Sequence, residues 1–298
     1  MPRLSAILCL LAIASIVSLP ADEPASKVET SAPLTLRWAD RYLTISGNPD
    51  GGNSIPGDAI RIHYLEAYCR GGSTDRDWAE TVIPHQTKVI SAGRSDAESK
   101  EGLIELEDRL ADGVIVRHRI EATHDEVRFT IVATNPTDQP SVVQWAQPCV
   151  RVDGFVGADR EDARSIRPDY VRKSFLMVDG RITRMPTEPW AVNARYEPGQ
   201  VYVPAGVDRN DVNPRPLSAI VPSSALVGCY SADDSKILGI VWSPCQEVFQ
   251  GVATCLHSDI RIGGLEPGEE KTIRGRIYLI DADLDQLLSR FRNDFPAE

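Results

Sequence analysis

The residues with the most obvious chemical potential lie in one polar and aromatic segment of the first third of the chain. It contains five side chains of the kinds that sugar sites use: Glu66, Arg70, Asp77, Trp78 and His85. An aromatic ring covers the apolar face of a sugar, and charged planar groups hydrogen-bond to its neighbouring hydroxyls. We expect these residues to bind substrate, with His85 also a catalytic candidate. An ordinary loop around a core tryptophan would have the same composition.

A second candidate set lies on one extended segment in the middle of the chain. Trp145, Gln147, Cys149 and Arg151 occupy alternate positions, so a strand would present all four on one face. A core face is uniformly apolar, whereas this one mixes an aromatic ring, an amide, a thiol and a guanidinium. We expect Trp145, Gln147 and Arg151 to line a substrate cleft. The alternative is a half-buried strand whose polar groups are satisfied by neighbours.

The third candidate is the sequence Cys255-Leu-His257-Ser-Asp259. In a strand, His257 and Asp259 project to the same side, where the carboxylate can orient the imidazole for acid–base catalysis. His257 and Asp259 are therefore predicted catalytic residues, although the same pair could instead brace a turn.

The sequence predicts no metal and no cofactor. It has no Cys-x-x-Cys pair and its five histidines are scattered, so a structural zinc site has no support. A metal site of His85, His257 and Asp259 would require the fold to bring distant segments together. His118 alternates with valines and is expected in the core. The motifs of serine hydrolases and of phosphate-binding loops are absent.

Composition and charge exclude several classes of partner. Hydrophobic residues make up 42% of the chain and charged residues 25%, which is typical of a globular protein. The net charge is −11, so nucleic acid and anionic membranes are not expected to attract the protein. A neutral, cationic or locally recognised ligand is expected instead.

The N-terminus resembles a secretory signal. Arg3 precedes the apolar run Leu4–Leu19, and a small residue, Ala21, comes before acidic residues, which is the pattern of a cleaved signal peptide. We therefore expect residues 1–21 to be a signal peptide and residues 22–32 to be a flexible linker. The mature protein would be exported, to the periplasm or the extracellular space, without a membrane span.

Export would place the remaining cysteines in an oxidising compartment. Five are left after cleavage: Cys69, Cys149, Cys229, Cys245 and Cys255. Cys245 and Cys255 flank a segment that resembles a turn and the start of a strand, which could bring them together as a disulfide. Buried thiols in a β-rich core are the alternative.

The pattern of the rest of the chain predicts one all-β domain over residues 33–298. Apolar residues alternate in Val114–Ala122 and in Val127–Ala133, and the residues between the two runs suit a hairpin. Asp179-Gly180 predicts another turn. A short C-terminal helix follows from Leu284, Leu287, Leu288 and Phe291 with Asp283 as N-cap, and we expect it at the sandwich edge. Further strands are predicted at Ala59–Tyr68, Ala225–Tyr230, Ile237–Trp242, Thr254–Ile262 and Thr272–Ile280.

The stretch Asp153–Pro216 differs from the strands around it. It is rich in prolines and charges, and long connections of this kind commonly cover a binding surface. Trp190, Tyr196 and Tyr202 are expected to anchor it.

Several segments follow one another in an order known from a protein family. Two paired strands (Ala111–Phe129) lead to an Asn-centred turn (Ala133–Pro140) and a further strand (Val142–Val152), with closing strands around Leu238–Trp242 and Leu265–Glu269. This order resembles galactose mutarotase-like proteins. The resemblance implies an antiparallel β-supersandwich with a sugar cleft, in a secreted bacterial member of that superfamily.

The catalytic pair of that family is not matched. The family uses a His on the strand after the Asn turn as general acid and a Glu after a later strand as general base. The matching positions here hold Gln147 and Ser243, with Glu247 four residues further on. An amide cannot donate and recover a proton near neutral pH, so the resemblance implies a cleft without the epimerase pair.

The favoured hypothesis is therefore an exported carbohydrate-binding protein. One alternative is a carbohydrate-active enzyme, a glycosidase, lyase or epimerase, that uses a His–carboxylate pair. The other is an envelope protein–protein interaction module, which would show a flat apolar patch instead of a concavity. The expected cleft is lined by Trp78, His85, Trp145, Gln147, Arg151 and His257.

Overall fold

The structure is a computed structural model that describes most of the chain after the predicted linker. The described residues are 34–47, 54–72, 77–90, 102–158, 168–195, 200–212 and 216–296. The predicted signal peptide and linker lie outside them. The residues from Ser31 to Glu298 group into one compact unit. No helix among the described residues is long and apolar enough to cross a membrane.

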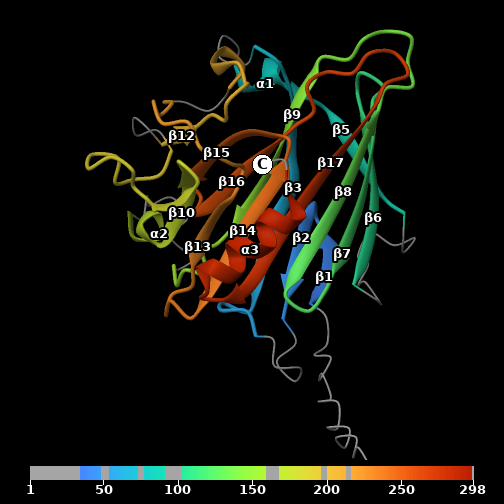
Figure 1. Cartoon of the computed structure of the whole chain (residues 1–298). Helices are drawn as coiled ribbons and strands as arrows, with labels where there is room; N and C mark the ends of the chain where they lie inside the picture. Colours follow the sequence, from blue (N-terminus) through green and yellow to red (C-terminus); the bar gives the residue numbers. More distant parts are fainter. Residues whose placement is uncertain are drawn as a thin grey trace, which may run out of the picture. The chain divides into compact units, whose positions relative to one another are not determined.

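Two antiparallel sheets form this unit, which confirms the predicted all-β sandwich (Figure 1). Along the first sheet the order is β1 (Thr35–Ala39), β2 (Tyr42–Ser46), β3 (Ala59–Arg70), β9 (Val143–Arg151), β16 (Cys255–Arg261), β15 (Cys245–Gly251) and β12 (Val201–Tyr202), with β4 (Val82–Ile83) paired to β3. Along the second sheet it is β11 (Arg181–Arg184), β10 (Ser174–Val178), β13 (Val227–Tyr230), β14 (Lys236–Ser243), β17 (Glu270–Asp281), β8 (Glu126–Thr134), β7 (Ile115–Ala122), β6 (Leu103–Leu110) and β5 (His85–Val89).

The predicted hairpins are present. β7 and β8 pair in register, with Ile120 opposite Phe129, and both side chains are buried in the main core. The turn between β10 and β11 is Asp179-Gly180, where both residues have positive φ, 50° and 72°. A two-residue turn of this kind matches the twist of paired strands and favours glycine.

The strand β15 was not predicted as a separate strand. All seven of its residues are buried, so the polar–apolar alternation that identifies a half-exposed strand is missing. In the hairpin of β15 and β16, Cys245 lies opposite Ile260 and Cys255 lies opposite Gly251. Cys245 and Cys255 are therefore at opposite ends of the hairpin. None of the five described cysteines forms a disulfide, and all are buried.

The C-terminal helix α3 (Leu284–Asp294) begins where it was predicted. The Asp283 side chain accepts a hydrogen bond from the backbone N–H of Gln286 at 2.9 Å. The helix lies on the outer face of β14 and β17 and not at the sandwich edge (Figure 1). Gly239 explains this position, because a Cβ there would lie 2.9 Å from a Leu287 methyl carbon.

A buried polar network joins the two sheets through the core. His118, expected in the core, receives a hydrogen bond from the Tyr64 hydroxyl on Nδ1 (3.0 Å) and donates from Nε2 to Asp108 (3.1 Å). The Tyr68 hydroxyl donates to the same Asp108 oxygen at 2.6 Å. Tyr64 and Tyr68 come from β3 of the first sheet, whereas Asp108 and His118 come from β6 and β7 of the second.

Candidate functional site

Most candidate residues lie on the outer face of the first sheet, the face turned away from the second sheet. On β9 and β16, Ala146, Val150, Leu256 and Ile260 belong to the core between the sheets. Successive strand residues point to opposite faces, so the alternate positions point outward. The outward set is Trp145, Gln147, Cys149, Arg151, Cys255, His257 and Asp259.

The pairing of β16 with β9 and β15 makes outward side chains of the three strands direct neighbours. The pairs Leu256–Val150 and Ile260–Ala146 place His257 across from Cys149 and Asp259 across from Gln147. On the other side, Phe249 of β15 lies opposite His257. Long-range pairing thus joins two candidate segments that are distant in the sequence.

His257 is at the centre of this arrangement. Its Nδ1 lies 3.1 Å from an Asp259 oxygen and its Nε2 lies 3.2 Å from the Cys255 sulfur. The Gln147 amide nitrogen lies 3.5 Å from Nδ1. The Phe249 ring stacks on the imidazole with ring centres 4.1 Å apart. The predicted contact between His257 and Asp259 is therefore present.

Burial and mutual charge shift the pKa values of these groups. Burial opposes a charge on His257, but Cys255 and Asp259 outweigh it and raise the pKa of His257 to about 10. A hydrogen bond with Cys149 lowers the pKa of Cys255 and raises that of Cys149. These shifts favour a positive charge on the His257 imidazole and a negative charge on the Cys255 sulfur.

Two carboxyl groups are buried next to this pair. Burial raises the pKa of Asp259 to about 6, with His257 opposing the shift. Burial also raises the pKa of Glu247 well above its usual value, and the charge of Asp259 adds to that effect. Glu247 lies on β15. Both carboxyl groups also raise the pKa of Cys69, after burial itself.

The aromatic end of the face is formed by Trp145 and Trp78. Trp145 is fully buried in a small cluster with Ala67 and Cys69, separate from the main core. Trp78 opens the short helix α1 (Trp78–Thr81), capped by the Asp77 side chain. Its ring centre lies 6.5 Å from that of Trp145, and 47% of its surface is exposed. Trp78 is thus a solvent-facing extension of the buried face.

Several polar atoms on this face have no hydrogen-bond partner among the described residues. They are the indole Nε1 of Trp145, both carboxyl oxygens of Glu247 and Oδ2 of Asp259. Glu247 and Asp259 are 0% exposed. Buried polar atoms are almost always paired because an unpaired one costs about 1–3 kcal/mol. These atoms could accept hydrogen bonds from, or donate them to, a ligand that reached this face.

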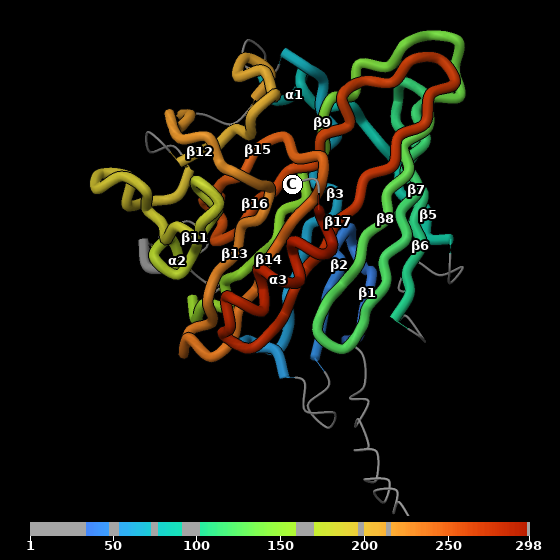
Figure 2. The backbone as a smooth tube through the Cα atoms, in the orientation of Figure 1, coloured from blue at the N-terminus to red at the C-terminus, as the bar shows by residue number. Residues whose placement is uncertain are grey.

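Described parts of the stretch between β9 and β13 lie beside β15, and one of them, β12, pairs with β15 (Figure 2). The Tyr170 hydroxyl, from helix α2 (Pro168–Lys173), donates to the Gly251 carbonyl. The backbone N–H of Arg195 donates to the Gln250 carbonyl at 2.9 Å. Phe249 packs with the buried valines Val201, Val203 and Val212.

The expected aromatic anchors of this stretch behave differently from one another. Tyr202 on β12 is buried, whereas Trp190 is 52% exposed. Tyr196 lies outside the described residues.

Other predicted site residues serve local structure. The Arg70 guanidinium donates to the carbonyls of Glu80 (3.2 Å) and Val82 (2.7 Å). Arg151 donates to the Ala253 carbonyl at 3.0 Å. One carboxyl oxygen of Glu66 lies 3.8 Å from Nδ1 of His63.

His85 is not brought to His257. It lies on β5 of the second sheet, where its ring contacts Tyr68 and its Nε2 lies 3.4 Å from the Arg41 guanidinium. A site that joins His85 to His257 and Asp259 is therefore not formed.

A cavity opens on the same outer face, over the first three strands. Its volume is about 740 Å³. Its lining does not include Trp78, Gln147 or His257. It is lined by Arg37, Ala39, Asp40, Tyr42, Thr44, Gly57, Asp58, Ala59, Arg61, Gly154 and Ala158.

Sequence reasoning missed the roles of Cys255 and Phe249. Cys255 is two residues before His257 and Asp259 is two residues after it. In a strand, this spacing indicates that all three side chains lie on one face. The contact of Phe249 with His257 depends on β15, and the sequence of β15 has no polar–apolar alternation that would predict a strand.

Comparison with known proteins gives a limited result. No protein-family model matches the chain, and no curated protein matches it in sequence. Similar solved structures include a putative aldose 1-epimerase from Escherichia coli (11% identity, 83% of this chain and 98% of that chain, TM-score 0.39). A galactose mutarotase-like protein from Lactobacillus casei is similar at 10% identity (83% and 97%, TM-score 0.44). A protein from Synechocystis sp. is similar at 11% identity (90% and 99%, TM-score 0.40).

Two of these three bear names of the superfamily that the sequence resembles. Because all three TM-scores are below 0.5, the chemistry of the site rests on the residues of this chain alone.

Proposed function

We propose that the protein is an exported carbohydrate-binding protein whose ligand lies on the outer face of β9, β16 and β15, beside Trp78. The exposed ring of Trp78, next to the buried Trp145, offers a surface for the apolar side of a sugar ring. Gln147, Glu247 and Asp259 are buried polar groups of the same face. The signal-like N-terminus supports export.

The observation that carries this proposal is the set of unpaired buried polar atoms. One is a donor, Nε1 of Trp145, and the others are oxygens of Glu247 and Asp259. A ligand that satisfies both kinds must donate and accept hydrogen bonds at neighbouring positions. Sugar hydroxyls do both, and apolar ligands do neither.

The contacts of His257 favour binding over acid–base catalysis by this residue. Asp259 engages one ring nitrogen and Cys255 the other, so neither faces a substrate proton directly. Flanking carboxyl groups of a glycosidase stand about 5–9.5 Å apart across the scissile bond. After burial itself, the charge of Asp259 raises the pKa of Glu247, and the separation of these two carboxyl groups is the distance that tests the glycosidase alternative.

The interaction-module alternative has less support. The exposed large hydrophobic side chains in the described part of the chain come from separate elements and loops, and single exposed residues of this kind are ordinary on protein surfaces. They are Trp78, Ile90, Val142, Trp190 and Val221.

The Trp78→Ala variant tests the proposal. A glycan array would first select a ligand, and tryptophan fluorescence would then follow its titration. Loss of the aromatic contact, which is worth about 0.5–1.5 kcal/mol, is expected to weaken binding about twofold to tenfold. Trp190→Ala is the matched control, because Trp190 is similarly exposed at 52% but makes no ring contact with this face among the described residues, and it should leave the affinity unchanged.

Equal affinities for the wild type, Trp78→Ala and Trp190→Ala would contradict the proposed position of the ligand. If no glycan changes the fluorescence of the wild type, the proposed function itself is wrong. Nuclear magnetic resonance spectra of the same sugar samples would show turnover as the loss of substrate signals, which would favour the enzymatic alternative.

A further inference from the structure

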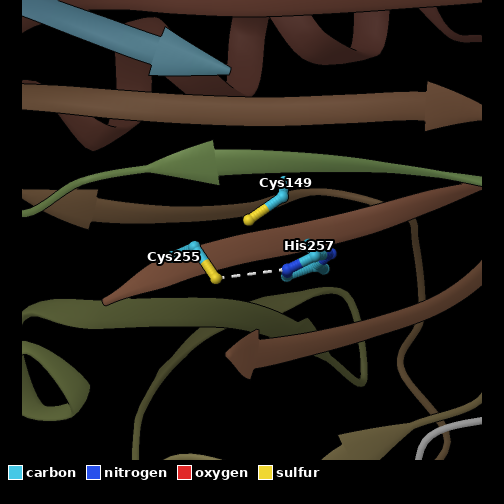
Figure 3. A group of neighbouring side chains, drawn as sticks. All are labelled: Cys149, Cys255 and His257. Carbon is cyan, nitrogen blue, oxygen red and sulfur yellow. Dashed lines mark hydrogen bonds between the residues drawn. The ribbon is translucent and has the colours of Figure 1, made fainter. Parts of the chain in front are cut away.

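We propose that Cys149, Cys255 and His257 form a binding site for a divalent transition metal of the zinc class. This goes beyond the proposed function and differs from the expectation drawn from the sequence. The ligand atoms of the three residues all lie within 4.8 Å of one another, and all three residues are buried. Figure 3 shows Cys149 on one strand and Cys255 with His257 on its neighbour.

The distances suit a tetrahedral ion. Zinc binds thiolate sulfur at about 2.3 Å and imidazole nitrogen at about 2.0–2.1 Å, so ligand atoms around one ion stand roughly 3.5–3.8 Å apart. The Cys255 sulfur and His257 Nε2 are 3.2 Å apart (Figure 3). A small outward rotation of side chains would admit an ion between them.

Asp259 completes the arrangement that zinc-binding histidines use. Its carboxylate contacts Nδ1 of His257 at 3.1 Å, which leaves Nε2 directed toward the two sulfurs. A carboxylate on the second ring nitrogen fixes the orientation and increases the basicity of a ligand histidine. A disulfide between Cys149 and Cys255 would need neither His257 nor Asp259.

Gly251 leaves space at the ligand atoms. A Cβ at this position would lie 2.3 Å from the Cys255 sulfur and 3.3 Å from His257 Nε2. Any other residue would therefore crowd both ligands from the same side.

The charge balance of binding is favourable. Three protein ligands leave the fourth tetrahedral position to a water molecule. Binding releases two protons from the Cys149, Cys255 and His257 group, so that two thiolates neutralise the divalent ion. No electron is transferred.

Cobalt(II) titration of the full chain, reduced with a phosphine and freed of metal, tests this proposal. We expect one Co²⁺ per chain, with a thiolate-to-cobalt charge-transfer band in the near ultraviolet, and displacement of Co²⁺ by Zn²⁺. Cys149→Ser and Cys255→Ser should each lose at least tenfold in affinity, because each removes a ligand. Cys229→Ser is the control, since Cys229 is also buried but lies on β13 of the second sheet.

Gly251→Ala is a second variant that keeps all three ligands. It is expected to weaken Co²⁺ binding because its methyl group occupies the space beside them. The titration of the wild type is decisive even if a cysteine variant fails to fold. A wild type without the charge-transfer band overturns the proposal, as does a Cys255→Ser variant that is folded by circular dichroism and binds Co²⁺ like the wild type. The proposal is also overturned if the purified chain contains a Cys149–Cys255 disulfide and if the chain binds no Co²⁺ after that disulfide is reduced.

Discussion

Asp108→Ala is expected to lower the free energy of unfolding by about 2–6 kcal/mol, because each of two buried donors left without its acceptor costs about 1–3 kcal/mol. Asp108 accepts hydrogen bonds from Tyr68 and His118, and its removal leaves both donors buried between the sheets. Urea unfolding followed by circular dichroism measures the change. Glu105→Ala is the control, because its pair with Arg119 is solvent-exposed and should contribute less than about 1 kcal/mol.

The same carboxylate predicts a pH dependence. Burial opposes the charge on Asp108, but hydrogen bonds from His118, Thr87 and Tyr68 outweigh it and lower the pKa. The unfolded state therefore binds its proton at higher pH than the folded state. The contribution of Asp108 to stability is fully present above the ordinary carboxyl pKa and is lost as the pH falls through the lowered one. Asp108→Asn should show a shallower loss of stability in acid than the wild type; identical acid profiles would contradict this assignment.

Glu247→Met is expected to have opposite effects on stability and on binding. Neither carboxyl oxygen of Glu247 has a partner among the residues described, so an apolar side chain of similar volume should raise the free energy of unfolding by about 1–3 kcal/mol. The loss of the acceptor should weaken sugar binding at least tenfold, because ligand hydrogen bonds to it are lost. A gain in stability with a loss of function is typical of residues kept for binding.

Glu126→Met is the matched control for this prediction. Glu126 is also buried, but Arg128 and Arg290 pair with it, so the same substitution there should destabilise the fold. If Glu247→Met destabilises the chain as much as Glu126→Met does, Glu247 has a structural role and the proposed site loses its main acceptor.

The parts of the fold that could be predicted from the sequence are those with a local pattern. Alternation located β7 and β8, and the spacing of Leu284, Leu287 and Phe291 with the Asp283 cap located α3. Asn135 was predicted as the centre of a turn, and its side-chain amide donates a hydrogen bond to the Gln139 carbonyl at 2.8 Å. These features depend on neighbours in the sequence.

The parts that could not be predicted depend on long-range pairing. Cys149 reaches Cys255 and His257 only because β9 pairs with β16, and nothing local specifies that pairing. His85 follows Trp78 closely in the sequence but belongs to the second sheet. The sequence indicated which side chains could do chemistry, whereas sheet order determined which of them meet.

The most direct measurement is the nuclear magnetic resonance signal of two indole N–H groups during titration with the selected sugar. Trp145 and Trp242 are both fully buried, and neither Nε1 has a partner among the described residues. Trp145 lies on the outer face, whereas Trp242 packs on Phe129 in the core between the sheets. Saturating sugar is expected to shift the Trp145 signal and to leave the Trp242 signal in place. Sugar binding without a shift at Trp145 would contradict the proposed binding site.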